Sequence, residues 1–143
     1  MTLADTNFWL ALSLSKHQFH RAVRDWLSKQ PDASVLFCRA TQQSFLRLLT
    51  TDSVMRLYDL PAMTNAAAWT LYDAFLTDRR IRFTNGPSAI DGRWKRFTAR
   101  SSASPKLWMD AYLAAFAMSS GHHFVTTDKA FRQFDGLHVV VIA

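Results

Sequence analysis

The chain has 143 residues, 49% of them hydrophobic, with only four Gly and four Pro, so we exclude disorder and expect residues 1–143 to form one domain. A single cysteine, Cys38, excludes an internal disulfide and a cysteine zinc site. The chain also has no apolar run long enough to span a membrane and no signal peptide. Together with the single cysteine, these features lead us to expect a cytoplasmic protein. The net charge of +6 suits a polyanionic or acidic partner, although an excess of Lys and Arg also serves solubility.

Short apolar runs alternate along the chain with longer segments of helical periodicity. We expect strands at Thr2–Ala4, Ser34–Cys38, Ile81–Thr84, Phe124–Thr127 and Val139–Ile142, and helices near 7–15, 17–29, 40–50, 64–77 and 105–120. Residues 84–105 are the least regular part and are expected to hold a short helix and a mobile basic loop. The alternation of strands and helices predicts an α/β fold with a mostly parallel central sheet.

Two aspartates stand at the ends of predicted strands. Asp5 follows the first strand and Asp128 follows the fourth, and the carboxyl ends of parallel strands meet at the edge where ligand sites gather. A third, Asp110, interrupts an apolar helix, where an unpaired carboxylate is costly to bury. Each has a simpler explanation, namely a helix cap for Asp5, a turn for Asp128, and an i,i+4 pair with Lys106 for Asp110. Together, three carboxylates are the oxygen ligands that Mg²⁺ or Mn²⁺ takes, so the pattern favours a metal site.

Five motifs occur in a familiar order over almost the whole chain: "LADTNFWLAL", "HQFHRAVRDWL", "FLRLLT", "MDAYLAAFA" and "FVTTDKAF". By these motifs the chain resembles a PIN-domain ribonuclease, and more closely a VapC-type toxin of a bacterial type II toxin–antitoxin pair. The resemblance implies a PIN-like three-layer sandwich whose metal-binding acids are Asp5, Asp110 and Asp128. It also matches Asn7 and Thr126 to the polar positions that accompany the first and last acids.

One position departs from the family pattern. Members usually carry another acid on the helix before the segment matched by "FLRLLT", and this chain has no carboxylate there. Ser44 is the first candidate for the equivalent position and Gln43 the second, and either side chain could hold water near the metal without supplying charge. Asp52 and Asp91 are further substitutes, but nothing in their spacing favours them.

The basic run "GRWKRF" lies between the predicted strand at 81–84 and the helix that carries Asp110. We expect Arg93, Lys95 and Arg96 to contact RNA phosphates, and Trp94 to stack on an unpaired base. The alternatives are a partly buried Trp94 and charged residues that only keep the protein soluble.

Four histidines invite a second metal interpretation. His17, His20, His122 and His123 are instead interpreted as structural residues or phosphate contacts, because nitrogen ligands suit softer metals than Mg²⁺.

The resemblance implies a Mg²⁺- or Mn²⁺-dependent endoribonuclease that cleaves structured RNA, either tRNA or rRNA, and is neutralised by a cognate antitoxin. It also implies a homodimer. A phosphohydrolase of another α/β family is a rival, but such enzymes usually need a second Asp two residues after the first, where this chain has Asn7. A non-catalytic or weakly active RNA- or protein-binding domain is the other rival, because of the missing acid.

Overall fold

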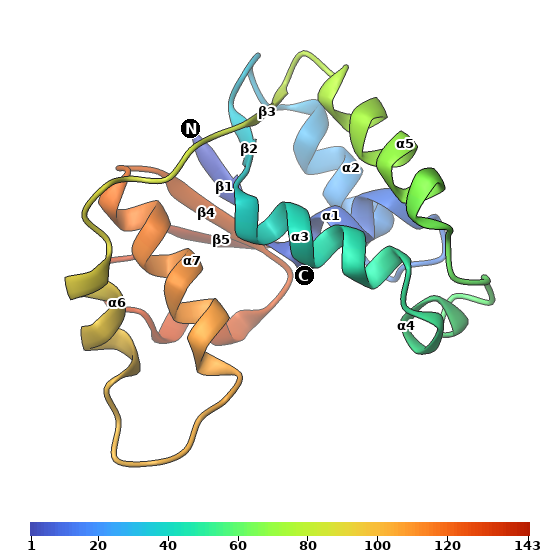
Figure 1. The fold of residues 1–143 in the computed structure, drawn as a ribbon. Coiled ribbons are helices and arrows are strands. Elements are labelled where there is room, and N and C mark those ends of the chain that lie inside the picture. Colours follow the sequence, from blue (N-terminus) through green and yellow to red (C-terminus); the bar gives the residue numbers. More distant parts are fainter.

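A five-stranded parallel sheet forms the centre of the molecule in the computed structural model, which describes residues 1–143 (Figure 1). Its strand order is β3-β2-β1-β4-β5, and all four neighbouring pairs are parallel. The strands are β1 (Thr2–Ala4), β2 (Val35–Phe37), β3 (Ile81–Phe83), β4 (His123–Thr126) and β5 (Val139–Val141). Each predicted strand is confirmed to within one residue at either end, and the expected α/β fold with a parallel sheet is confirmed with it.

Seven α-helices and one 3₁₀ helix connect the strands. They are α1 (Thr6–Ser13), α2 (His20–Ser28), α3 (Arg39–Leu49), α4 (Asp52–Arg56), α5 (Asn65–Leu76), α6 (Asp91–Thr98), α7 (Leu107–Ser119) and η1 (Lys129–Gln133). The short helix expected within 84–105 is α6, whereas α4 and η1 were not predicted. None of these helices has the length and apolar character that a membrane span requires.

Helix α2 begins three residues later than its periodicity predicts. Residues 15–19 form a turn instead, in which Nδ1 of His17 accepts a hydrogen bond from the Phe19 backbone N–H at 3.1 Å. The His17 ring also stacks on Tyr58, with 5.5 Å between ring centroids. These local contacts replace the first helical turn, and they give His17 a structural role, one of the two roles expected of it.

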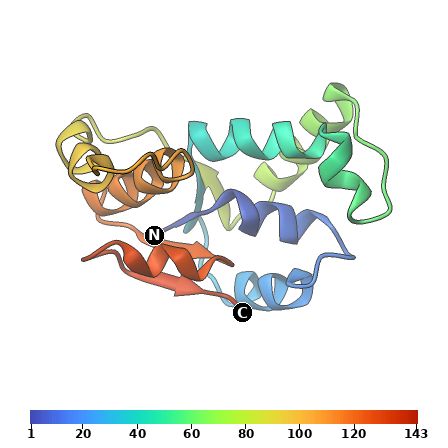
Figure 2. The same ribbon diagram turned by 90° about the horizontal axis from the view of Figure 1, so that it is seen from below.

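The sheet is covered on both faces, as Figures 1 and 2 show. Successive residues of a strand point to opposite sides, and the two buried clusters divide the strands accordingly. Ala4 and Val125 belong to the cluster built with helices α1 to α5, whereas Leu3 and Phe124 belong to the cluster built with α6, α7 and η1. The result is the three-layer sandwich that the resemblance implies.

The order of the strands places β1 at the centre of the sheet, between β2 and β4. From β1 the chain runs outward to β2 and β3 on one side, and it later returns to place β4 and β5 on the other side. The switch point therefore lies between β1 and β4, where Ala4 pairs with Val125 and the Asp5 N–H donates to the Val125 carbonyl at 2.9 Å. In parallel α/β sheets this crevice at the carboxyl ends of the strands is where ligands bind.

Candidate active site

Asp5 caps helix α1 from the carboxyl end of β1. Its backbone is extended (φ −66°, ψ 157°), and its Oδ1 accepts a hydrogen bond from the Thr6 backbone N–H at 2.7 Å. The residue is only 5% exposed, and burial is the main cause that raises the pKa of its carboxyl group from 3.8 to about 6. Capping is therefore real, but it leaves the buried charge of Asp5 largely uncompensated.

Thr126 ties the ends of β1 and β4 together. Its buried hydroxyl donates to Oδ2 of Asp5 at 2.7 Å and accepts from the backbone N–H of Asp128 at 3.0 Å. Asp128 in turn caps η1, because its Oδ1 accepts the Ala130 N–H at 2.8 Å. One hydroxyl thus fixes the rotamer of the first acid and the backbone of the last.

Asp110 lies in the first turn of α7 and is half-buried. Burial, followed by the negative charge of Asp128, raises the pKa of its carboxyl group to about 6. The charges of Asp110 and Asp128 also raise the pKa of Asp5. Asp5 thus lies within range of the charges of both other acids, and Asp110 lies within range of the charge of Asp128.

No cationic side chain neutralises this cluster of charge. The five ion pairs of the structure use Asp25, Asp32, Asp52, Asp59 and Asp78, and none of them involves the three acids at the sheet edge. The alternative pairing of Asp110 with Lys106 is thus absent. Uncompensated carboxylates at this edge leave a charge that a cation would balance.

The three carboxyl groups do not form a closed metal-ligand cage, since no three His, Cys, Asp or Glu side chains stand close enough to enclose an ion directly. Like charges repel one another, and Asp5 and Asp128 already accept hydrogen bonds from backbone N–H groups. The donor set contains only oxygen and carries three negative charges. It therefore fits a hard cation such as Mg²⁺, which keeps several of its own waters and needs few direct protein ligands.

The remaining predicted polar residues take different positions. Asn7 is exposed on the first turn of α1, two residues after Asp5. On α3, Ser44 is half-buried and Gln43 is exposed, and both line a groove between α3 and α7. Gln42 is buried instead, where its Oε1 accepts a hydrogen bond from Arg39 at 2.5 Å. Ser44 and Gln43 therefore remain the two candidates for the missing acid.

Trp94 is half-buried and contacts two aromatic residues of α7. Its Nε1 donates to the Trp108 carbonyl at 3.0 Å, and its ring meets the rings of Trp108 and Tyr112 edge to face. Arg93 also turns toward α7, where it donates to the Ser119 hydroxyl at 3.2 Å. Trp94 thus packs α6 against α7, which is the alternative given above, while Lys95 and Arg96 stay exposed.

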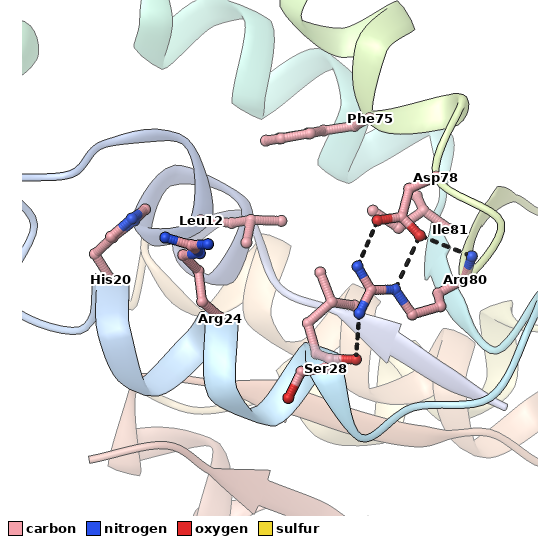
Figure 3. Close-up of a pocket in the computed structure, with 9 residues that line it drawn as sticks. Leu12, His20, Arg24, Ser28, Phe75, Asp78, Arg80 and Ile81 are labelled. Carbon is pink, nitrogen blue, oxygen red and sulfur yellow. Dashed lines mark hydrogen bonds and ion pairs between the residues drawn. The ribbon is translucent and has the colours of Figure 1, made fainter.

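A separate cavity of about 320 Å³ lies between α1, α2, the end of α5 and the start of β3 (Figure 3). It contains the Asp78–Arg80 pair, in which Nε and Nη2 of Arg80 donate to the two carboxylate oxygens at 2.9 and 2.7 Å. Arg80 sits at the amino end of β3, so this cavity lies apart from the carboxyl edge that carries Asp5. His20 borders it and is held by Nδ1 against the Ala11 carbonyl at 2.8 Å, a structural contact.

Comparison of the sequence with known proteins identifies the family of the chain. The family model for the PIN domain matches residues 2–137, so the chain belongs to the PIN-domain family. Ribonuclease VapC41 of Mycobacterium tuberculosis is 50% identical over 145 residues, which cover 100% of this chain and 99% of the relative. Ribonuclease VapC31 of the same organism is 32% identical, covering 94% of this chain and 93% of that protein. Within the PIN-domain family the chain is thus of the VapC type, as its motifs predict.

Solved structures show the same fold at low sequence identity. VapC20 of Mycobacterium tuberculosis, described as a sarcin–ricin loop cleaving toxin, aligns with a TM-score of 0.68 at 16% identity, covering 97% of this chain and 98% of that one. FitAcB from Neisseria gonorrhoeae aligns with a TM-score of 0.67 at 16% identity, covering 97% and 96%. These similarities confirm the PIN-like architecture.

Sequence reasoning missed the two arginines that flank Gln43. Arg39, Gln43 and Arg47 recur every four residues on α3 and all line the groove beside α7. That spacing puts them on one face of a helix, a signal that was present in the sequence.

Proposed function

We propose that the protein is a metal-dependent endoribonuclease, the toxin of a type II toxin–antitoxin pair, and that it cleaves structured RNA such as tRNA or rRNA. One observation supports the proposal: Asp5 and Asp128 follow the adjacent strands β1 and β4, the charge of Asp128 also acts on Asp110, and none of the three acids belongs to an ion pair. The full-length similarity to proteins named ribonuclease supports the reaction class.

Asp5, Asp110 and Asp128 would hold Mg²⁺ or Mn²⁺. The bound cation would activate water and stabilise the charge that develops on the cleaved phosphate. Thr126 holds the Asp5 carboxylate in one rotamer, so that its oxygens face the same place in every turnover. Asn7, exposed beside Asp5, would donate its amide N–H groups to a phosphate oxygen. Ser44 and Gln43 would orient water from α3 without adding charge.

Lys95 and Arg96 supply a further contact surface for RNA. Both are exposed on α6, and neither belongs to an ion pair. Their contacts with phosphates would add affinity and little sequence preference.

The test is cleavage of a labelled hairpin RNA with Mg²⁺ or Mn²⁺. The wild-type protein should cut it, and Asp5→Asn should lower the rate by at least about a hundredfold, because even outer-shell residues of metal sites cost ten- to a hundredfold. Asp73→Asn is the matched control, since Asp73 is exposed on α5 and unpaired. Cleavage that persists unchanged in Asp5→Asn would contradict the proposed site.

We also propose that a cognate antitoxin binds the protein and that two copies form a homodimer. Structural relatives include a toxin–antitoxin complex from Klebsiella pneumoniae and VapBC-1 from nontypeable Haemophilus influenzae, which supports a protein partner. Co-expression with the cognate antitoxin should abolish cleavage. Light scattering of the purified chain should give twice the mass of 16.3 kDa.

A second candidate function is a weakly active or non-catalytic domain that binds RNA or protein. The neutral side chains of Ser44 and Gln43 favour it, because the site has one carboxylate fewer than the family pattern. RNA binding without any cleavage in Mg²⁺ or Mn²⁺ would select this function over the first.

A further inference from the structure

A groove of about 590 Å³ is lined by residues of α3 and α7, whose positions in the fold Figure 1 shows. Its α3 wall carries Arg39, Gln43, Ser44 and Arg47, and its α7 wall carries Met109 and Tyr112. One wall is therefore polar and basic, whereas the other is apolar and aromatic.

The two arginines of this groove have no acidic partner. Arg47 is exposed and belongs to no ion pair, in contrast to Arg56, Arg79 and Arg80 elsewhere. Arg39 donates to Gln42, and its guanidinium lies 4.6 Å from the centroid of the Phe83 ring. Both contacts orient the Arg39 side chain while leaving its positive charge unneutralised.

The groove adjoins the carboxylate edge. Helix α3 begins at Arg39, directly beyond the carboxyl end of β2, and β2 pairs with the strand that leads into Asp5. On the other wall, Met109 immediately precedes Asp110 in α7. A chain lying in the groove would therefore run toward the acids.

We propose that this groove seats the backbone of the RNA strand that enters the carboxylate site, an inference that rests on the proposed function. Arg39 and Arg47 are eight residues apart on one helix face, about 12 Å along its axis, so they would contact different phosphates. Tyr112 and the exposed Met109 would contact the bases from the opposite wall. The groove thereby selects a single strand with its bases turned out, in preference to a closed duplex.

Binding is measured separately from cleavage. The probe is a fluorescein-labelled single-stranded RNA of about twelve nucleotides, within the usual range of site sizes, and its anisotropy is followed in EDTA at several salt concentrations. Arg39→Ala and Arg47→Ala should each weaken binding on the order of fivefold and lower the salt slope by about 0.7, the value for one phosphate contact on a single strand. Arg47→Lys should restore most of the slope, because Lys keeps the charge.

Arg21→Ala serves as the matched control. Arg21 is exposed on α2, outside the groove, and its replacement removes the same charge. An equal loss of affinity in all three alanine variants would show that net charge alone is responsible, and would overturn the proposal. So would RNA binding that both groove variants leave unchanged, or a wild-type protein that binds no RNA.

Two further outcomes distinguish RNA binding in the groove from antitoxin binding and from the proposed cleavage reaction. Groove variants that retain RNA binding but no longer bind the antitoxin would assign the groove to a protein partner and overturn the proposal. Wild-type protein that binds RNA through Arg39 and Arg47 yet cuts nothing with Mn²⁺ would support the groove and contradict the proposed reaction.

Discussion

Two buried or half-buried carboxylates of this molecule have opposite electrostatic surroundings. Asp78, in the cavity of Figure 3, faces the guanidinium of Arg80, whose hydrogen bonds hold the pKa of the Asp78 carboxyl below 3.8. Asp5, at the switch point of the sheet, has only hydroxyl and backbone donors, and its pKa rises to about 6. The same side chain is thus stabilised as an anion in one place and destabilised in the other.

The difference separates a carboxylate that is paired within the fold from one that is left unpaired at the proposed site. Arg80 also donates to the Leu27 carbonyl, so the Asp78–Arg80 pair links the amino end of β3 to α2. The whole chain has 17 Lys and Arg, but none of them forms an ion pair with the three acids at the carboxyl edge. Perturbed pKa values of this kind gather at functional sites, because a charge left unpaired by the fold is available to a ligand.

The largest expected effect is on the free energy of unfolding when Asp5 is replaced. The pKa of Asp5 is raised in the folded state, so the folded protein binds more protons than the unfolded chain between about pH 4 and pH 6, and its free energy of unfolding falls as pH rises through that window. A shift from 3.8 to about 6 corresponds to at most about 3 kcal/mol. Asp5→Asn should therefore stabilise the metal-free protein at pH 8 and flatten this dependence in urea titrations.

In the same urea titrations, Asp78→Asn should have the opposite effect on stability. The lowered pKa of Asp78 contributes stability that is present above pH 3.8 and is lost as pH falls below it. This variant should be less stable than the wild type at pH 8. Destabilisation by both substitutions at pH 8 would contradict the account of Asp5.

A smaller effect is expected from the hydroxyl that joins Asp5 to Asp128. Thr126→Val removes the hydrogen bond to Oδ2 of Asp5 and the acceptor for the Asp128 N–H. We expect Mn²⁺ affinity to fall about ten- to a hundredfold, as for other outer-shell residues. Thr126→Ser keeps the hydroxyl and should retain near-normal affinity by calorimetry. A Val variant that binds Mn²⁺ as tightly as the Ser variant would assign Thr126 to packing alone.

The smallest expected effect is a gain of charge on α3. Ser44→Glu should tighten Mn²⁺ binding several-fold, on the order of 1 kcal/mol or less for a partly solvated charge. Gln43→Glu should do less, because Gln43 is exposed. If calorimetry shows no change in either variant, then neither side chain approaches the metal.

Features set by neighbouring residues could be predicted from the sequence, whereas features set by contacts between distant residues could not. Strand ends and the carboxyl edge followed from local apolar runs, so the positions of Asp5 and Asp128 were predictable. Helix α4 has only five residues and is held through Met55 in the core, a tertiary contact without a periodic signal.

The surroundings of individual side chains were harder to predict. Trp94 lies in a basic run that is typical of RNA contact, yet its indole packs on Trp108, fourteen residues away. The hydrogen bond from Thr126 to Asp5 spans 121 residues and was not predicted, since the family resemblance matched Thr126 only to the polar position that accompanies the last acid. Such pairings depend on how helices and strands meet, which no local pattern encodes.

Calorimetric titration of Mn²⁺ into the metal-free protein near pH 6.5 tests the central claim most directly. The account predicts saturable binding at one site, at least tenfold weaker in Asp110→Asn and in Asp128→Asn than in Asp73→Asn. It also predicts proton release on binding, seen as a dependence of the heat on the buffer, because Asp5 and Asp110 have pKa values of about 6. Equal Mn²⁺ affinity in all these variants, or no saturable binding to the wild type, would contradict it.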